Sequence, residues 1–228
     1  MPTLVRRLAA EALGTFTLVF IGCAAVMVDS FPRGRFGLMG IAAAHGLALA
    51  VAVTATMRIS GGHLNPAVTL GLVAGRRFAL KDAIPYLAAQ LAGAVLAVLL
   101  IQLVYPTAVG EVMAYGTPSL ASTITLGTAI GIEAVLTFFL VSAVFGTVVS
   151  ADAPKVGGFG VGLILWAGVL VGGPLTGAAL NPARAFGPAL VAGDWTGQAV
   201  WWIGPLLGGL LAGLLWDRVL LAGEAKQG

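Results

Sequence analysis

Two stretches of the chain decide how it folds: "ISGGHLNPAVTLG" at residues 59–71 and "LTGAALNPARAFG" at residues 175–187. Each places an Asn-Pro-Ala tripeptide in strongly apolar surroundings, although asparagine is costly to desolvate and proline lacks a backbone donor. Proline suits the first turn of a helix, where its missing N–H would have no partner anyway. We therefore predict a short helix beginning at each tripeptide, near residues 66–75 and 182–190. Ten residues of helix rise about 15 Å, which is half of a bilayer's hydrocarbon core.

The composition places the chain among membrane proteins. Of its 228 residues, 59% are hydrophobic and 9% are charged, and the mean hydropathy is +1.01. A soluble domain averages about 25% charged residues. The formal net charge of +3 rests on few charges without a Lys/Arg-rich run, so no nucleic-acid partner is expected. The single cysteine, Cys23, cannot form an internal disulfide and is expected to be a small buried residue.

Six further stretches are long enough to cross about 30 Å of hydrocarbon as helices. We expect them near residues 7–28, 37–57, 83–105, 123–149, 156–173 and 200–221. The first has the basic start of a signal peptide, but its apolar part is long enough to span and more spans follow, so we predict a retained helix. An even number of spans puts both termini on one side of the membrane.

The lysines and arginines orient the chain. With the termini inside, nine of them lie on inner segments and three on outer segments, which predicts cytoplasmic termini. The inner ones are Arg6, Arg7, Arg58, Arg76, Arg77, Lys81, Lys155, Arg218 and Lys226, and the outer ones are Arg33, Arg35 and Arg184.

The two halves of the chain resemble each other. Seven positions of the two quoted stretches match or nearly match; "EALGTFTLVF" from Glu11 matches "EAVLTFFLVS" from Glu133, and "QLAGAVLAVLL" from Gln90 matches "PLLGGLLAGLL" from Pro205. Each half contains three spans, an odd number, so the second copy enters the membrane from the opposite side. We predict an all-α membrane protein of six transmembrane helices and two re-entrant half-helices. It forms one channel domain over residues 1–228, with repeat 1 at about 5–110 and the inverted repeat 2 at about 120–222.

The half-helix starts are expected to meet at mid-membrane. A helix start carries partial positive charge and free N–H groups, which an asparagine carbonyl oxygen can cap while its NH₂ points into a lumen. Residues just before each tripeptide cannot be helical, and irregular backbone at this depth must lie beside protein or water. Their carbonyls are expected to line the path: Gly61, Gly62, His63, Leu64, Gly177, Ala179 and Leu180. Two re-entrant hairpins that only pack together are the alternative, but packing needs no asparagine pair.

Several polar residues lie inside the apolar stretches. Arg184 must line water or have partners at this depth, and pairing with a carbonyl alone is its structural alternative. His63 is expected to brace its loop or to face the inner vestibule. Glu11 and Glu133, at matching positions, are expected to support the two loops, and proton-carrying acids of a coupled transporter are the alternative. The chain has no metal-ligand spacing, nucleophile motif or P-loop, so neither a cofactor, a metal nor an enzymatic activity is expected.

"SGGHLNPAVTLG" and "NPARAFGPA", with the two glutamates, resemble the aquaporin (major intrinsic protein) family over about residues 5–220. The resemblance implies a pore in which Asn65-Pro66-Ala67 and Asn181-Pro182-Ala183 begin the half-helices and both asparagines donate to water. It places Arg184 in a selectivity filter near the outer mouth, together with His45, Val169 and Ala178. Glu11 and Glu133 then hold the loops through backbone N–H groups. A homotetramer with one pore per subunit is also implied.

The four filter residues indicate which branch of the aquaporin family the chain resembles. His, Val, Ala and Arg, with "HGLALAVAV", are similar to plant vacuolar-membrane (tonoplast-type) aquaporins, which often pass ammonia, urea or peroxide besides water. Strict water channels usually have Phe at the His45 position and His at the Val169 position. Glycerol facilitators pair two aromatic residues there and have Asp after the arginine, where this chain has Ala185. Some tonoplast-type relatives add an outer-loop histidine, which "YPTAVGEVMAYGTPSLAS" lacks, and this weakens the case for ammonia.

The sequence thus predicts a passive channel that conducts water in single file and excludes ions and protons. A glycerol or urea facilitator is the first alternative, and an ion-coupled transporter with the same symmetry is the second. Expected partners are water, small neutral solutes, the lipid bilayer and further copies of the chain. Short termini without regulatory motifs favour a prokaryotic plasma membrane.

Overall fold

The computed structural model describes residues 2–31, 34–154 and 156–222. Six of its helices are long and apolar enough to cross a membrane. They are α1 (Leu4–Asp29), α2 (Gly37–Ser60), α4 (Leu80–Val104), α6 (Leu126–Val144) with its π-helical turn η2 (Phe145–Val149), α7 (Phe159–Thr176), and α9 (Gln198–Leu215) with its π-helical turn η3 (Trp216–Leu220). Each overlaps a predicted span with ends within a few residues, and the predicted all-α class is confirmed.

The two half-helices begin at the prolines, as the sequence predicts. They are α3 (Pro66–Ala74) and α8 (Pro182–Ala192). Asn65 and Asn181 precede them in extended conformation, and their side-chain oxygens accept hydrogen bonds from the first free backbone N–H groups. The local sequence therefore places each helix start by capping on one side and by proline on the other.

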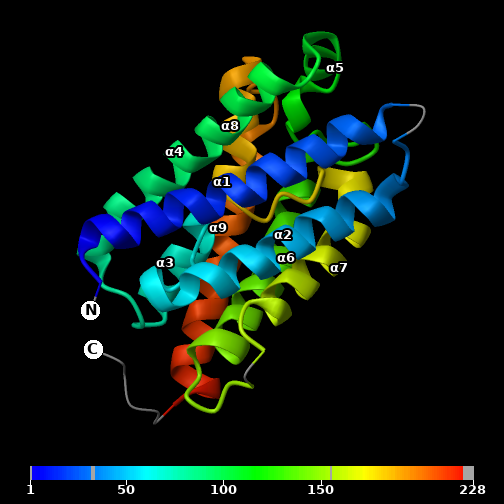
Figure 1. Ribbon diagram of the computed structural model, residues 1–228. Coiled ribbons are helices and arrows are strands. Elements are labelled where there is room, and N and C mark those ends of the chain that lie inside the picture. Colours follow the sequence, from blue (N-terminus) through cyan, green and yellow to red (C-terminus); the bar gives the residue numbers. More distant parts are fainter. Residues whose placement is uncertain (1, 32–33, 155, 223–228) are drawn as a thin grey trace.

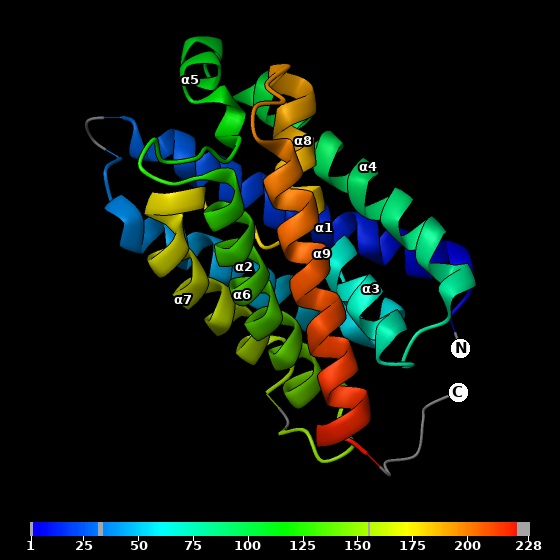
Figure 2. The same ribbon diagram turned by 180° about the vertical axis from the view of Figure 1, so that it is seen from behind.

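The helix contacts show the inverted repeat. In the first half α1 packs against α2 and α4, and in the second half α6 packs against α7 and α9. The halves meet where α2 contacts α7, α3 contacts α9, and α4 contacts α8. In Figures 1 and 2, α3 lies toward the end of the molecule where α1 begins, and α8 lies toward the opposite end. The half-helices therefore enter from opposite sides and point their starts at each other.

Glycines bring equivalent helices together at matching places in the two halves. A Cβ at Gly93 of α4 would collide with the backbone of Ala12 in α1, and one at Gly208 of α9 would collide with the backbone of Ala134 in α6. Small residues let helix backbones approach closely where lipid supplies no hydrophobic driving force. The same close contact joins α1 to α4 in the first half and α6 to α9 in the second.

One part of the fold is absent from the sequence prediction. The segment between α4 and α6 contains a short helix, α5 (Thr107–Val112), and a 3₁₀ turn, η1 (Ala114–Gly116). Helices this short carry no readable periodicity. Ala114 and Tyr115 have left-handed φ values of 43° and 50°, and the Tyr115 side chain is buried.

Both ends of the described chain lie on the same side. Arg7, near the start of α1, donates to Asp82 in the first turn of α4 over 3.4 Å. Arg76, just after α3, donates from Nε to Asp217 in η3 over 2.7 Å. The start of the first span therefore contacts the first turn of α4, and the end of the last span contacts the connection between α3 and α4. Three charges used in the orientation prediction, Arg33, Lys155 and Lys226, fall outside the described residues.

Candidate functional site

The starts of the two half-helices are joined by a reciprocal pair of hydrogen bonds. Asn65 donates from Nδ2 to the carbonyl of Leu180 over 2.9 Å, and Asn181 donates from Nδ2 to the carbonyl of Leu64 over 2.9 Å. Each Oδ1 caps its own helix, at 2.8 Å from the N–H of Ala67 and 2.9 Å from that of Ala183. An amide NH₂ has two hydrogens, so one on each asparagine remains to donate elsewhere.

A buried carboxylate holds each loop in front of its half-helix. Glu11 accepts from the backbone N–H of His63 over 3.0 Å and from that of Leu64 over 2.7 Å. Glu133 does the same in the second half, and its donors are the backbone N–H groups of Ala179 (3.0 Å) and Leu180 (2.8 Å). Both glutamates are fully buried. Paired donors of this kind are what a buried charge requires, and the matching arrangement fits supporting carboxylates.

The loops need this support because their backbone is unusual. Leu64 and Leu180 both have φ of 52°, and Ala178 has φ of 44°. Side-chain-bearing residues adopt this left-handed region rarely. The turns direct successive N–H groups toward the glutamates and leave residues 61–64 and 177–180 outside any helix.

A second matched pair, which the sequence analysis missed, closes each loop. Tyr86 of α4 donates its hydroxyl to the carbonyl of Ser60 over 2.8 Å, and Trp201 of α9 donates Nε1 to the carbonyl of Thr176 over 2.9 Å. The available signal was that the two residues stand at equal distances before Gln90 and Pro205 in the aligned repeats, four positions in each case.

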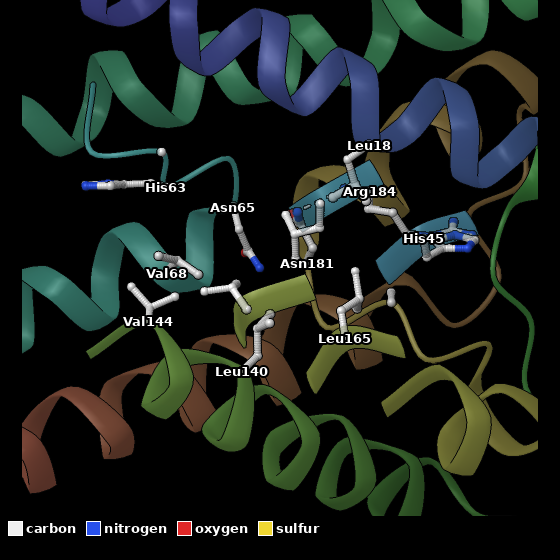
Figure 3. Close-up of a pocket in the computed structure, with 14 residues that line it drawn as sticks. Leu18, His45, His63, Asn65, Val68, Leu140, Val144, Leu165, Asn181 and Arg184 are labelled. Carbon is white, nitrogen blue, oxygen red and sulfur yellow. Dashed lines mark hydrogen bonds between the residues drawn. The ribbon is translucent and has the colours of Figure 1, made fainter. Parts of the chain in front are cut away.

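A narrow central cavity with an empty volume of about 390 Å³ passes the junction. Figure 3 shows its lining residues in a row that runs from His45 and Arg184 past the two asparagines to His63. The polar side chains of the lining are His45, His63, Asn65, Asn181 and Arg184, and the remaining lining residues are Leu18, Leu49, Gly62, Val68, Leu140, Val144, Val161, Leu165 and Ala179. A path with hydrogen-bonding groups along it and apolar walls elsewhere suits small neutral molecules.

His45 and Arg184 stand where this cavity meets an outer one. The outer cavity has an empty volume of about 550 Å³, and Val169 and Gly177 are among its other lining residues. Arg184 donates from one terminal nitrogen to the carbonyl of Gly116 over 2.9 Å and from the other to Nε2 of His45 over 3.3 Å. Its Nε is buried and has no hydrogen-bond partner in the described part of the chain.

The hydrogen-bond partners of His45 indicate the protonation state of its ring. Nδ1 lies 2.9 Å from the carbonyl of Ile41, and a carbonyl only accepts, so Nδ1 carries a hydrogen. Nε2 faces an Arg184 nitrogen, which only donates. The ring is therefore neutral, and the filter charge belongs to Arg184.

Two glycines that the sequence analysis passed over make this filter possible. A Cβ at Gly22 of α1 would collide with the His45 ring. Gly116 has φ of 80°, and a Cβ there would stand 2.8 Å from the Cα of Cys23. Gly22 lies in "IGCAA" of the first span, and Gly116 lies in "AYGTP" between the third and fourth spans. Neither stretch indicates which distant residue its glycine contacts.

Some of the remaining predicted site residues line one of the two cavities, and others do not. Gly62, His63 and Ala179 line the central cavity, and the carbonyls of Leu64 and Leu180 each accept one hydrogen bond from the asparagine amide of the other half. Ala178 is only 1% exposed. Its methyl carbon lies 3.2 Å from where a Cβ of Gly172 would be. Neither Ala178 nor Gly61 is among the lining residues of the two cavities.

The described residues contain no group of three or more His, Cys, Asp or Glu side chains that could hold a metal ion.

The comparison with protein families agrees with a channel. The model of the family "Major intrinsic protein" matches residues 1–216. The chain belongs to the major intrinsic protein, or aquaporin, family. It is thus an integral multi-pass membrane channel and not an enzyme, in a family that transports water and small solutes.

Several plant proteins are similar to the chain over most of its length. The chain is 46% identical over 228 residues to "Aquaporin TIP4-4" of Zea mays, covering 96% of this chain and 88% of that protein. It is 41% identical over 240 residues to "Probable aquaporin TIP4-1" of Oryza sativa subsp. japonica, covering 98% and 90%. The X-ray structure of the aquaglyceroporin from Plasmodium falciparum superposes with a TM-score of 0.83 at 25% identity, covering 96% of this chain and 97% of that one. The plant relatives agree with the tonoplast-type resemblance and give no support to a prokaryotic plasma membrane.

Proposed function

We propose that this chain is a passive channel that conducts water in single file. The observation that carries the proposal is the pair of capped half-helix starts, whose asparagines bond reciprocally and line one cavity. A water molecule in this path exchanges each lost partner for an amide or filter donor. Its transfer therefore costs little.

Cations are opposed at two places. Arg184 presents a fixed positive charge at the filter, and both half-helix starts direct the positive ends of their dipoles at the centre. A sodium ion that enters loses much of its hydration shell and meets few free acceptors. This is the general mechanism of aquaporin-type pores.

The proposed solute range extends beyond water to ammonia, urea and hydrogen peroxide. Val169, a small side chain, stands in the outer cavity beside His45 and Arg184, where a bulkier residue would narrow the filter. We propose that Ala178 contributes to the filter through its loop backbone and not through its buried methyl group. A glycerol facilitator is the second candidate, because the same small residue leaves room for a polyol.

We further propose cytoplasmic termini and a homotetramer with one pore per subunit. The charge distribution supports the first, and family resemblance supports the second. Cysteine labelling from either side of sealed vesicles tests the orientation, and native mass spectrometry tests the oligomer. A terminus labelled only from the outer side, or a monomer in mild detergent, would contradict the respective proposal.

Flux measurements on one proteoliposome preparation test the solute proposal. Leu165 lines the central cavity, so Leu165→Trp serves as a control in which the same fold has a plugged path. We expect osmotic shrinkage much faster than with this control, together with measurable ammonia flux and slow re-swelling in glycerol. Re-swelling in glycerol as fast as the water response would favour the facilitator. Water flux equal to the plugged control would rule out the channel proposal.

A further inference from the structure

A further cavity, here called the side cavity, lies beside the path at the outer end of the molecule. Its empty volume is about 710 Å³, and residues from the end of α4, from α5, from η1 and from the end of α8 line it. In Figures 1 and 2, α5 and the end of α8 lie at the same end of the molecule, opposite α3. The side cavity shares no lining residue with the central or the outer cavity. Its polar lining residues are Gln102, Glu111, Tyr115 and Asp194.

Tyr115 directs an unpartnered hydroxyl into the side cavity. The residue is only 4% exposed, and its ring packs so closely on Gly110 that a Cβ there would collide with it. The hydroxyl has no hydrogen bond within the described residues, yet it is not among the unpartnered oxygens that protein atoms fully enclose. Because the side chain lines the side cavity, its hydroxyl opens there. A buried tyrosine hydroxyl usually has a partner, so this one is available to a ligand.

Two carboxylates of the lining lack a cationic partner. The side chain of Glu111, in α5, forms no hydrogen bond or ion pair within the described residues. Asp194, just after α8, accepts at Oδ1 from the N–H of Thr196 over 3.0 Å, and its Oδ2 has no partner in the described part of the chain. None of the lining residues is positively charged. A cation bound here would therefore meet two negative charges and no competing positive one.

The inverted repeat shows what occupies the corresponding place at the inner end. In the aligned repeats Gln102 corresponds to Asp217, and Ala192 corresponds to Arg76. Arg76 donates from Nε to Asp217 over 2.7 Å, so a guanidinium joins the end of the half-helix region to the end of the last span. Gln102 and Ala192 both line the side cavity, and neither is charged. The outer end thus has a cavity with two acidic residues where the inner end has an ion pair.

The lining suits an organic cation better than a metal ion. Calcium takes about six to eight oxygen ligands, and the described residues hold no group of three or more His, Cys, Asp or Glu side chains that could bind a metal. An ammonium or guanidinium group instead offers separate N–H donors to separate acceptors. Its carbon chain can lie along apolar wall, and an aromatic ring attracts the charge. The apolar wall here consists of Ala114, Val191 and Ala192.

We propose that the side cavity binds a small organic cation through Glu111, Asp194 and the Tyr115 hydroxyl. The ligand belongs to the alkylammonium or alkylguanidinium class and takes the place that the Arg76 side chain has at the inner end. Binding also reaches the filter, because Gly116 follows Tyr115 and its carbonyl accepts from Arg184 over 2.9 Å. A cation held by Tyr115 therefore stabilises the turn that positions the filter arginine. The inference does not depend on which solutes the channel passes.

Agmatine, which carries an ammonium and a guanidinium group on a short carbon chain, is the probe. Its binding is measured by isothermal titration calorimetry on the full chain in a non-ionic detergent, and we expect one saturable site per chain. Glu111→Gln and Asp194→Asn each remove a charge and retain an oxygen acceptor, so each should weaken binding about three- to fivefold. Asp152→Asn removes an exposed carboxylate between η2 and α7, outside the lining, and should bind like the wild type.

Two further variants test the remaining parts of the site. Tyr115→Phe keeps the ring and removes the hydroxyl, which should weaken binding about threefold. Ala192→Arg supplies the guanidinium that the inner end has in Arg76, and it should abolish agmatine binding while the protein stays folded. Agmatine binding to Ala192→Arg as tight as to the wild type would refute the correspondence between the two ends.

An ammonium group can come from a dissolved amine or from the headgroup of phosphatidylethanolamine. Short-chain phosphatidylethanolamine is therefore titrated against agmatine in the same detergent, with short-chain phosphatidylglycerol as its control. Competition by phosphatidylethanolamine alone would support the site and identify the lipid headgroup as a ligand. Agmatine binding unaffected by either lipid would support the site with a dissolved cation as its ligand.

Hydrogen exchange locates the bound probe. We expect agmatine to slow amide exchange in residues 110–117 of the wild type and to have no such effect in the Glu111→Gln, Asp194→Asn double variant. The inference is overturned if the wild type shows no saturable agmatine binding, if Asp152→Asn weakens binding as much as the lining variants do, or if protection appears elsewhere. Saturable binding of calcium without binding of agmatine would overturn the assigned ligand class.

Discussion

Replacing Asn181 with serine separates the two tasks of its amide. In the wild type the N–H of Ala183 donates to Oδ1 of Asn181 over 2.9 Å. Serine caps a helix about as well as asparagine, so in the variant the serine hydroxyl can accept this hydrogen bond. Serine has no group that replaces Nδ2, which donates to the carbonyl of Leu64 over 2.9 Å. Leu64 is 0% exposed, and a buried acceptor without a partner costs about 1–3 kcal/mol. We expect Asn181→Ser to lower the free energy of unfolding by about 2 kcal/mol.

Asn181→Ala provides the matched comparison. It loses the cross-junction bond and also the cap, which contributes about 1 kcal/mol more, so about 3 kcal/mol is expected in total. The assay is reversible unfolding in mixed micelles, titrated with a denaturing detergent and followed by tryptophan fluorescence. Asn65→Ser, the counterpart in the first half, should match Asn181→Ser. If both serine variants unfold like the wild type and the alanine variant loses only the cap contribution, the reciprocal bonds do not hold the half-helices together.

Three further predictions concern the filter. Gly116→Ala should lower water flux and destabilise the protein by about 1–2 kcal/mol, since left-handed backbone strains a side-chain-bearing residue. Gly131→Ala, where an added Cβ meets no atom within 4 Å, is its control: it adds the same methyl group inside helix α6 without strain and should leave flux unchanged and not destabilise the protein. Equal behaviour of the two variants in flux and unfolding assays would contradict the role given to Gly116. Arg184→Val should keep water flux within a few-fold while proton flux rises clearly above that of empty vesicles; a proton-tight variant would show that the half-helix dipoles suffice without the arginine. Val169→His should reduce urea and ammonia flux more than water flux in proteoliposomes, and an equal reduction of all three would place Val169 outside the size-selecting position.

Much of the fold was predictable because one physical constraint dominates it. Lipid offers no hydrogen bonds, so apolar runs of sufficient length must be helices, and the runs show directly in the sequence. Pro66 and Pro182 mark helix starts for the same local reason in both halves. The duplication then supplied the topology, since an odd number of spans per half inverts the second copy.

The contacts that assemble the filter were harder to predict. Gly116 reaches Arg184 from a segment whose short helix and left-handed turn leave no periodic pattern. The reciprocal bonds of Asn65 and Asn181 depend on φ values that leucine rarely adopts, at Leu64 and Leu180. Such positions follow from tertiary contacts rather than local preference. The sequence therefore identified the asparagines and the arginine but not their partners.

The most direct test of the central claim compares water and proton permeability in the same proteoliposomes. If paired asparagine amides pass water between two opposed half-helix dipoles, the vesicles should shrink rapidly with a low activation energy. Their proton permeability should equal that of empty liposomes. Water permeability no higher than in empty liposomes, or rapid proton flux accompanying the water, would contradict the account.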